Sequence, residues 1–222
     1  MSVRTRIRSV LRKYLWPIYE RSSYKQARNR IKNNRFTLLA SNCIGGVIYH
    51  HLGMSFDSPM INISMKQPEF CMFCSDLDYY LSSELHFFES DFPFPCAHLG
   101  IDEKEITIEF RHYKNADEAK SKWEERKKRI HRDNLFIILN DGNGLTSDDI
   151  KLLEKCNYRR KVIFTSKHRP EIEDSFYLHA MRKYNDALFM QAERHPVTGK
   201  WPWEKEFDFV AWLNGEDKYR FD

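Results

Sequence analysis

The chain has 222 residues, of which 41% are hydrophobic, 14% aromatic and 31% charged. This balance excludes a disordered chain and suffices for one core domain of about 180 residues. Eleven Lys or Arg and one Glu give the first 35 residues a net charge of +10, although the whole chain carries only +4. We therefore expect a basic arm, residues 1–32, followed by a mildly acidic domain, residues 33–222.

The arm is predicted to be a basic amphipathic helix. Its apolar residues recur at helical spacing and form one stripe, which comprises Val3, Ile7, Val10, Leu11, Tyr14, Leu15 and Ile18. Arginines interrupt every apolar run, which excludes a membrane span and a cleaved signal peptide. Anionic lipid attracts each nearby Lys or Arg by about 1 kcal/mol, so residues 1–20 are expected to lie on an anionic membrane surface.

Two alternatives for the arm stay open, packing of its stripe on the protein's own body and contact with nucleic acid. The body is acidic and shows no second basic surface, so no nucleic-acid partner is expected. The cysteine count is five, an odd number, and no secretory signal is evident. We therefore expect reduced thiols and a cytoplasmic protein, peripheral at the inner face of the cell membrane.

Beyond the arm, short apolar runs alternate with helical patterns. In chain order, the expected elements up to residue 113 are a strand over residues 36–40, a helix over 47–52, a strand over 60–64, a helical face from 68 to 85 and a strand over 105–113. The expected elements after it are a charged helix from 115 or 117 to 132, a strand over 134–139, a helix from 146 to 155, strands over 161–165 and 175–178, and a helix over 207–213. This order predicts an α/β fold, a mostly parallel sheet with helices on both faces.

In such sheets ligands collect beyond the carboxyl ends of the strands, which directs attention to the loops after the buried runs. Asn42, Cys43, Gly45 and Gly46 follow the first run. Bare backbone amides at this strand-to-helix junction can hold a phosphate, and a tight turn explains the two glycines equally well. Cys43 and His112 can pair as nucleophile and base if the fold brings them together.

Asp141 follows the second buried run in an Asp-Gly-Asn turn that is similar to the acid-x-acid pattern of metal-dependent nucleotide-sugar enzymes. A simple turn before a capped helix is the alternative. A calcium loop is excluded because Leu145 and Leu152 stand where oxygen ligands are needed. Cys71 and Cys74 have CxxC spacing but lie on an apolar helical face, so no metal site is assigned to them.

Two further groups are candidates for binding an anionic substrate. Trp123, Arg126 and Arg129 recur at three-residue steps on the charged helix, a pattern that also fits a solvated face. Thr165 ends a buried strand and Lys167 follows it directly, which would direct the Lys167 cation into the crevice.

These runs together resemble bacterial exopolysaccharide and capsular polysaccharide biosynthesis proteins that share an α/β domain of unknown function. The resemblance covers roughly residues 35–215 and rests on residues 41–49 (SNCIGGVIY), 52–53, 58–59, 112–113, 119, 122–123, 126, 129–130, 133–136 (DNLF), 163–167 (IFTSK), 207–208 and 212–214. It implies that the clusters around residues 42–46, 123–129, Asp133 with Asn134, and 165–167 form one site.

The resemblance implies a transferase in surface polysaccharide assembly, most concretely a glycosyltransferase with a nucleotide-sugar donor and a lipid-linked glycan acceptor. The amides of residues 42–46 would hold the donor phosphate, Lys167 and Arg126 would offset charge on the leaving diphosphate, and Asp141 or Asp133 would act as base or metal ligand. A divalent metal bound with the nucleotide sugar stays open as a cofactor. The alternatives are an acyl- or phosphoryl-type decorating transferase, in which Cys43 would carry the acyl group, and a non-enzymatic membrane-docked scaffold.

Overall fold

The computed structural model describes residues 3–142, 144–184 and 194–221, with side chains from Lys13 onward in these ranges. The strands are β1 (Thr37–Ala40), β2 (Leu85–Phe88), β3 (Cys96–Leu99), β4 (Ile106–Glu109), β5 (Leu135–Asn140), β6 (Arg160–Thr165) and β7 (Ser175–Tyr177). The α-helices are α1 (Val3–Arg30), α2 (Ile44–Leu52), α3 (Gln67–Ser75), α4 (Leu77–Ser82), α5 (Ala116–Lys127), α6 (Ser147–Leu152) and α7 (Phe209–Leu213).

A four-stranded parallel sheet in the order β1-β5-β6-β7 forms the centre of the protein. All six residues of β5 are buried, as expected for a strand that is covered on both faces. Side chains alternate between two cores: Leu39 and Ile137 face α3 and α6, whereas Leu38 and Ile138 face α2 and α7. The predicted α/β fold with helices on both faces of a mostly parallel sheet is confirmed.

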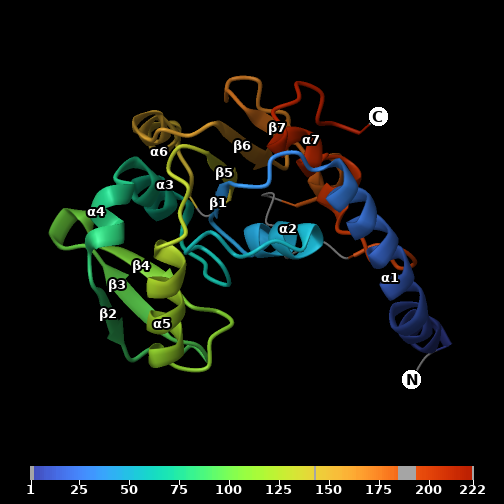
Figure 1. The fold of residues 1–222 in the computed structure, drawn as a ribbon, viewed down its shortest axis with the longest axis horizontal. Helices are drawn as coiled ribbons and strands as arrows, with labels where there is room; N and C mark the ends of the chain where they lie inside the picture. Colours follow the sequence, from blue (N-terminus) through green and yellow to red (C-terminus); the bar gives the residue numbers. More distant parts are fainter. Residues whose placement is uncertain (1–2, 143, 185–193, 222) are drawn as a thin grey trace.

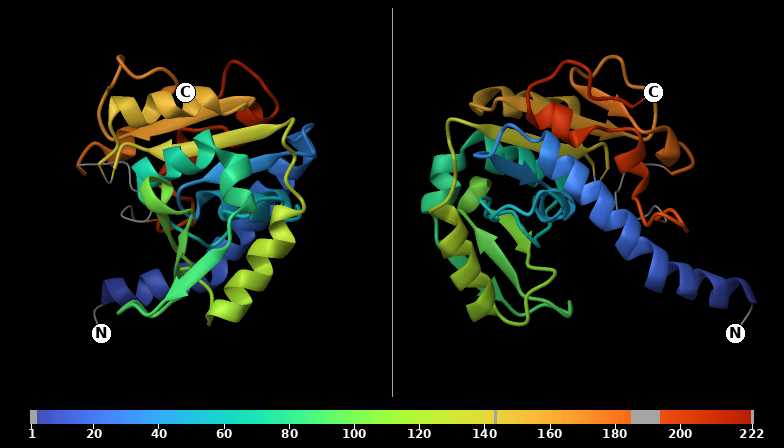
Figure 2. Two further views of the ribbon diagram at one scale, coloured as in Figure 1. Left: turned by 90° about the vertical axis from the view of Figure 1, so that its left-hand side faces the viewer. Right: turned by 45° about the vertical axis from the view of Figure 1, so that its right-hand side comes forward.

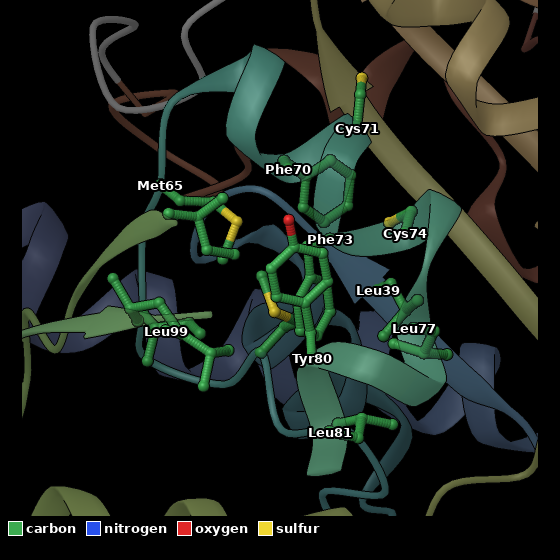
Figure 3. Packing of buried hydrophobic residues seen from close by; sticks show 14 of the residues in the cluster. Leu39, Met65, Phe70, Cys71, Phe73, Cys74, Leu77, Tyr80, Leu81 and Leu99 are labelled. Carbon is green, nitrogen blue, oxygen red and sulfur yellow. The ribbon is translucent and has the colours of Figure 1, made fainter. Parts of the chain in front are cut away.

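A three-stranded antiparallel sheet in the order β2-β3-β4 lies with α5 at one end of the molecule, and α1 lies at the other (Figure 1). One core joins the two sheets. Figure 3 shows Phe70, Phe73 and Tyr80 of α3 and α4 packed in the same space as Leu39 of β1 and Leu99 of β3. The rings of Phe73 and Tyr80 are 5.7 Å apart, centroid to centroid.

Helix α1 projects from the body, to which its second half is attached (Figure 2). The attached side chains recur at four-residue steps and are Trp16, Glu20, Tyr24 and Arg28. On other sides of the helix, Tyr14 and Ile18 are 58% and 63% exposed. Of the described stripe residues, Tyr14 and Ile18 are therefore exposed and Leu15 is half-buried, and the side chains of Val3, Ile7, Val10 and Leu11 lie outside the description.

In the described residues, no helix is long and apolar enough to cross a membrane. The first turn of α1 contains no acidic residue. Arg28 and Arg30 lie in its last turn, where cations complement the helix dipole.

Four sequence predictions of local structure were wrong. The strand predicted over residues 105–113 ends at Glu109. Residues 60–64 do not form a strand, because Asn62 adopts a left-handed backbone conformation with φ 62°. The helical face predicted from residue 68 to 85 is divided into α3 and α4 at Asp76, whose φ of −135° is not helical, and its end belongs to β2. The charged helix ends at Lys127, five residues early. The small antiparallel sheet was not predicted as a unit.

Candidate functional site

A cleft of about 520 Å³ opens between α1, α2 and the segment after residue 194, and we call it the α2 cleft. The wall of the cleft includes Tyr24, Cys43, Gly46, Asn62, His112 and Arg194. Cys43 and Gly46 follow the carboxyl end of β1. The cleft thus lies beyond the carboxyl end of β1, the edge strand of the parallel sheet. Ligands of open α/β sheets bind beyond the carboxyl ends of the strands.

The fold brings Cys43 and His112 together, although 69 residues separate them: Sγ of Cys43 lies 3.5 Å from Nε2 of His112. Cys43 directly precedes α2, and His112 follows β4 on an exposed loop. Burial raises the pKa of the Cys43 thiol, and the neighbouring Arg111 guanidinium acts in the opposite direction. The thiol therefore needs a base to form a thiolate at neutral pH, and His112 is placed to be that base.

The loop that carries His112 is anchored through the next residue. Tyr113 is buried, and its hydroxyl donates a 2.8 Å hydrogen bond to the carbonyl oxygen of Ile61. Arg126 donates from Nη1 to the same carbonyl oxygen, at 3.2 Å, and to the Tyr113 hydroxyl. Asn62 follows Ile61 directly, so one buried clamp fixes both His112 and Asn62 at the α2 cleft.

Arg126 is thus a support for the cleft wall and not an exposed anion ligand. Its side chain is only 7% exposed and lies over the rings of Phe56 and Tyr113, at 5.5 and 5.9 Å. Phe56 itself lines the cleft. The sequence analysis predicted that Arg126 offsets the charge of a leaving diphosphate, whereas in the structure its guanidinium binds protein groups behind the cleft wall.

Helix α2 is the floor of the cleft, and its two glycines have different structural roles. A Cβ on Gly45 would lie 3.3 Å from Cβ of Ala40, a tight contact that favours glycine where α2 packs on β1. A Cβ on Gly46 would meet only Ile61 and Asn62, at 3.6 and 3.8 Å, which are ordinary contacts. Gly46 lines the cleft, whereas Asn42 accepts a hydrogen bond from the amide of Ile44 and so shapes the start of the helix.

The far wall of the cleft is aromatic and nearly neutral. The ring of Tyr24 stacks on that of His51 at 4.1 Å, and burial lowers the pKa of His51 to about 3. Glu204 lies 3.3 Å from His51, and burial raises its pKa to about 7. Arg194 is held by Glu20 and lies over the rings of Trp16 and Trp201, so its charge is already compensated.

The carboxyl ends of β5 and β6 carry the predicted residues Asp141, Thr165 and Lys167, but none of them lines the α2 cleft. Asp141 accepts a 2.9 Å hydrogen bond from the amide of Ser166, which ties the two loops together. Thr165 is fully buried, and Lys167 is exposed. Asn143, the second half of the predicted Asp-Gly-Asn metal pattern, lies outside the described residues.

Asp133 and Asn134 lie at the opposite end of β5. The six residues of this strand, at about 3.3 Å each, put about 20 Å between its two ends. Asn134 donates hydrogen bonds to Asn33 and to the carbonyl of Arg35, at 2.9 and 2.6 Å. The expectation that these two residues share a site with residues 42–46 and 165–167 was wrong, because they lie at the amino ends of the strands.

Trp123 was also wrongly expected to contact substrate. Its side chain is only 1% exposed and packs between Phe73 and Phe110, with ring centroids 6.2 and 6.4 Å away. Helix α5 turns this ring inward to join the small antiparallel sheet to α3, so Trp123 is a core residue.

Potential metal ligands do not gather anywhere in the described parts of the chain: no group of three or more His, Cys, Asp or Glu side chains is placed to hold an ion. Cys71 and Cys74 are buried, and burial raises both thiol pKa values, that of Cys71 to about 12. Such thiols are inert at neutral pH.

Asn62, Tyr24 and Arg194 are cleft residues that no sequence motif indicated. Asn62 gave one weak signal, since it is, with Ser64, one of two polar residues in the otherwise apolar run from 60 to 65. Tyr24 and Arg194 gave none, because they come from segments about 170 residues apart that meet only in the folded chain.

Comparison with known proteins places this chain in a wider group. A family model described as a domain of unknown function, DUF1919, matches residues 17–214, a range that includes each cleft residue named above. An uncharacterized protein of Haemophilus influenzae is 32% identical over 187 residues, which make up 83% of this chain and 87% of that protein. The first turns of α1 precede the range that the family model matches.

Proposed function

This chain belongs to the DUF1919 family, and we propose that it is an acyltransferase that carries the acyl group as a thioester on Cys43. The observation that supports this proposal is the 3.5 Å contact between Sγ of Cys43 and Nε2 of His112 at the α2 cleft. A nucleophile within reach of a base is the arrangement that covalent catalysis requires.

In the proposed reaction, the Cys43 thiol attacks the acyl carbon of an activated ester or thioester while Nε2 of His112 accepts the thiol proton. A C–S bond forms, the bond to the leaving group breaks, and His112 gives the proton to the leaving group. A hydroxyl of the acceptor then attacks the thioester as His112 takes its proton. The product ester leaves, and the proton returns to Sγ of Cys43.

The acceptor we propose is a sugar hydroxyl of a surface polysaccharide intermediate, in line with the sequence resemblance to exopolysaccharide and capsular polysaccharide biosynthesis proteins. The aromatic, nearly neutral wall of the cleft suits an uncharged ring. A nucleotide-sugar donor would instead need uncompensated cations for its diphosphate, whereas Arg194 is paired with Glu20.

We further propose that α1 lies on an anionic membrane surface, where lipid-linked glycans are found. The support is the +10 charge of the first 35 residues and the exposure of Tyr14 and Ile18 on a helix that projects from the body. Because α1 also forms a wall of the α2 cleft, membrane docking would hold the cleft near the bilayer.

The test is mass spectrometry of the intact protein after incubation with p-nitrophenyl acetate and, separately, with an acetyl thioester. The proposal expects one acetyl group on Cys43, and none on a Cys43→Ala variant. His112→Gln should slow acylation about 100-fold or more, the usual contribution of a positioned base. The matched control is Cys156→Ala, which removes a half-buried thiol outside the cleft and should leave acylation unchanged. A wild-type protein that acquires no acyl group from either donor would refute the proposal.

A further inference from the structure

We propose that Asn62 and Gly46 form the slot for the substrate's carbonyl group beside Cys43, with the Asn62 side-chain amide donating a hydrogen bond to the carbonyl oxygen. This inference rests on the proposed acyl transfer and adds its electrophile-binding residues. It follows from three features of the α2 cleft: the backbone of Asn62, the clamp beneath it and the missing side chain of Gly46.

Asn62 adopts a left-handed backbone conformation, φ 62°, which asparagine tolerates better than most residues other than glycine and which turns its side chain out of the run of residues 60–64. Its side chain lines the cleft and is half-buried. Within the ranges 13–142, 144–184 and 194–221, no hydrogen bond involves its amide group. The side-chain amide of Asn62 is therefore available to a ligand in the α2 cleft, beside Gly46.

The clamp beneath Asn62 is built to hold it still. Two donors, the Tyr113 hydroxyl and Nη1 of Arg126, bind the carbonyl oxygen of Ile61 at 2.8 and 3.2 Å. Both side chains are at least nine-tenths buried, at 6% and 7% exposure. Rigid placement of a donor before reaction is the condition for stabilising charge that develops on a carbonyl oxygen.

Gly46 forms the opposite side of the slot. Neither its backbone nor its packing requires glycine, because it lies in α2 and a Cβ would be 3.8 Å from Oδ1 of Asn62 and 3.6 Å from Ile61. Glycine inside a helix is less favourable than alanine. The bare surface of Gly46 faces the cleft one turn from Cys43, so a Cβ there would occupy space that the substrate needs.

The chemistry of the slot selects its ligand. The Asn62 amide is neutral, and Arg194 on the cleft wall is paired with Glu20. Arg111 near Cys43 is paired with Glu109. A carboxylate or phosphate would therefore be desolvated without a compensating charge, whereas the oxygen of an ester or thioester carbonyl is well matched. The negative charge that appears on this oxygen as Cys43 attacks is what the amide would stabilise.

The experiment compares Asn62→Gly and Gly46→Ala with wild type in two reactions of Cys43. Acylation by p-nitrophenyl acetate passes through a tetrahedral oxyanion, whereas alkylation by iodoacetamide does not. Loss of the donor in Asn62→Gly should slow acylation about 100-fold and leave alkylation within about twofold of wild type. Gly46→Ala should slow acylation similarly without lowering the urea midpoint of unfolding, whereas Gly45→Ala should lower that midpoint because of its contact with Ala40.

The control for the backbone is Asp102→Gly, which also replaces a left-handed residue, φ 51°, but outside the cleft. It should leave both reactions unchanged. Wild-type acylation rates in Asn62→Gly, or an equal loss of acylation and alkylation, would overturn the inference while leaving the Cys43 thioester intact. Absence of acylation in the wild-type protein would overturn the proposed function and the slot with it.

Discussion

Replacing Tyr113 by Phe should weaken both the fold and the α2 cleft through the loss of one oxygen atom. The ring keeps its packing, since phenylalanine has the same shape. The carbonyl oxygen of Ile61 loses its 2.8 Å donor, and Arg126 loses the hydroxyl that accepts from Nη1. Only the 3.2 Å bond from Arg126 to Ile61 then remains in the clamp.

The expected cost follows from these two bonds. A neutral hydrogen bond contributes about 1 kcal/mol net, and one from a charged donor about 1.5–3 kcal/mol. Because Arg126 keeps one partner, we expect Tyr113→Phe to lower the free energy of unfolding by about 2–3 kcal/mol. The matched control is Tyr80→Phe, which removes one neutral bond, 2.9 Å from the hydroxyl to the carbonyl of Lys104, and should cost about 1 kcal/mol.

Urea unfolding followed by tryptophan fluorescence measures both variants, and p-nitrophenyl acetate measures acylation of Cys43. Tyr113→Phe should acylate more slowly than wild type even where both are fully folded, because His112 and Asn62 depend on the same clamp. Tyr80→Phe should acylate normally. If Tyr113→Phe cost no more than Tyr80→Phe, or reacted as fast as wild type, the clamp would not be what positions the cleft.

Three further outcomes are expected. Burial raises the pKa of Glu204 to about 7, so ionisation of Glu204 destabilises the folded wild-type protein as pH rises from about 4.5 to 7. Glu204→Gln lacks this loss, and its stability relative to wild type should therefore rise over that range and then level off. Urea midpoints at several pH values measure the difference. Tyr14→Asp with Ile18→Asp should reduce co-sedimentation with phosphatidylglycerol vesicles, and unchanged binding would exclude this face of α1. Iodoacetamide should label Cys74 only after unfolding, since this thiol is buried and its pKa is raised well above normal, whereas Cys43 should react in the native protein.

The parallel sheet could be predicted because its strands are local signals. The apolar runs that became β1, β5 and β6 are each bounded by polar turn residues, and the capping box of Thr146 and Asp149 marked the start of α6. The antiparallel sheet could not, because β2 (LHFF) and β3 (CAHL) are only four residues long and have no clear apolar alternation, and Pro93 and Pro95 lie between them. The run over residues 60–64 has the apolar pattern of a strand, but the left-handed backbone of Asn62 makes it a turn.

For the site, the sequence could nominate residue types but not their neighbours. Cys43 with His112 was one weak pairing among several, and only the fold shows that β4 ends beside the start of α2. Asp141 was nominated from its Asp-Gly-Asn turn, and Asp133 from the resemblance, as alternatives for one role. The structure places them at the two ends of one strand, and so at opposite edges of the sheet.

The pairing of β1 with β5 also bears on how the protein emerges from the ribosome. Thr37 pairs with Leu135, so β1 has no neighbour in the sheet until 98 further residues have been made. At about 5–20 residues per second, this interval lasts about 5–20 s. All four residues of β1 are buried in the native protein, and during that time they form an exposed, aggregation-prone segment without a neighbouring strand. We therefore expect chaperones to bind β1 in the nascent chain before β5 is complete. If synthesis stalls within α5, we expect the nascent chain to aggregate.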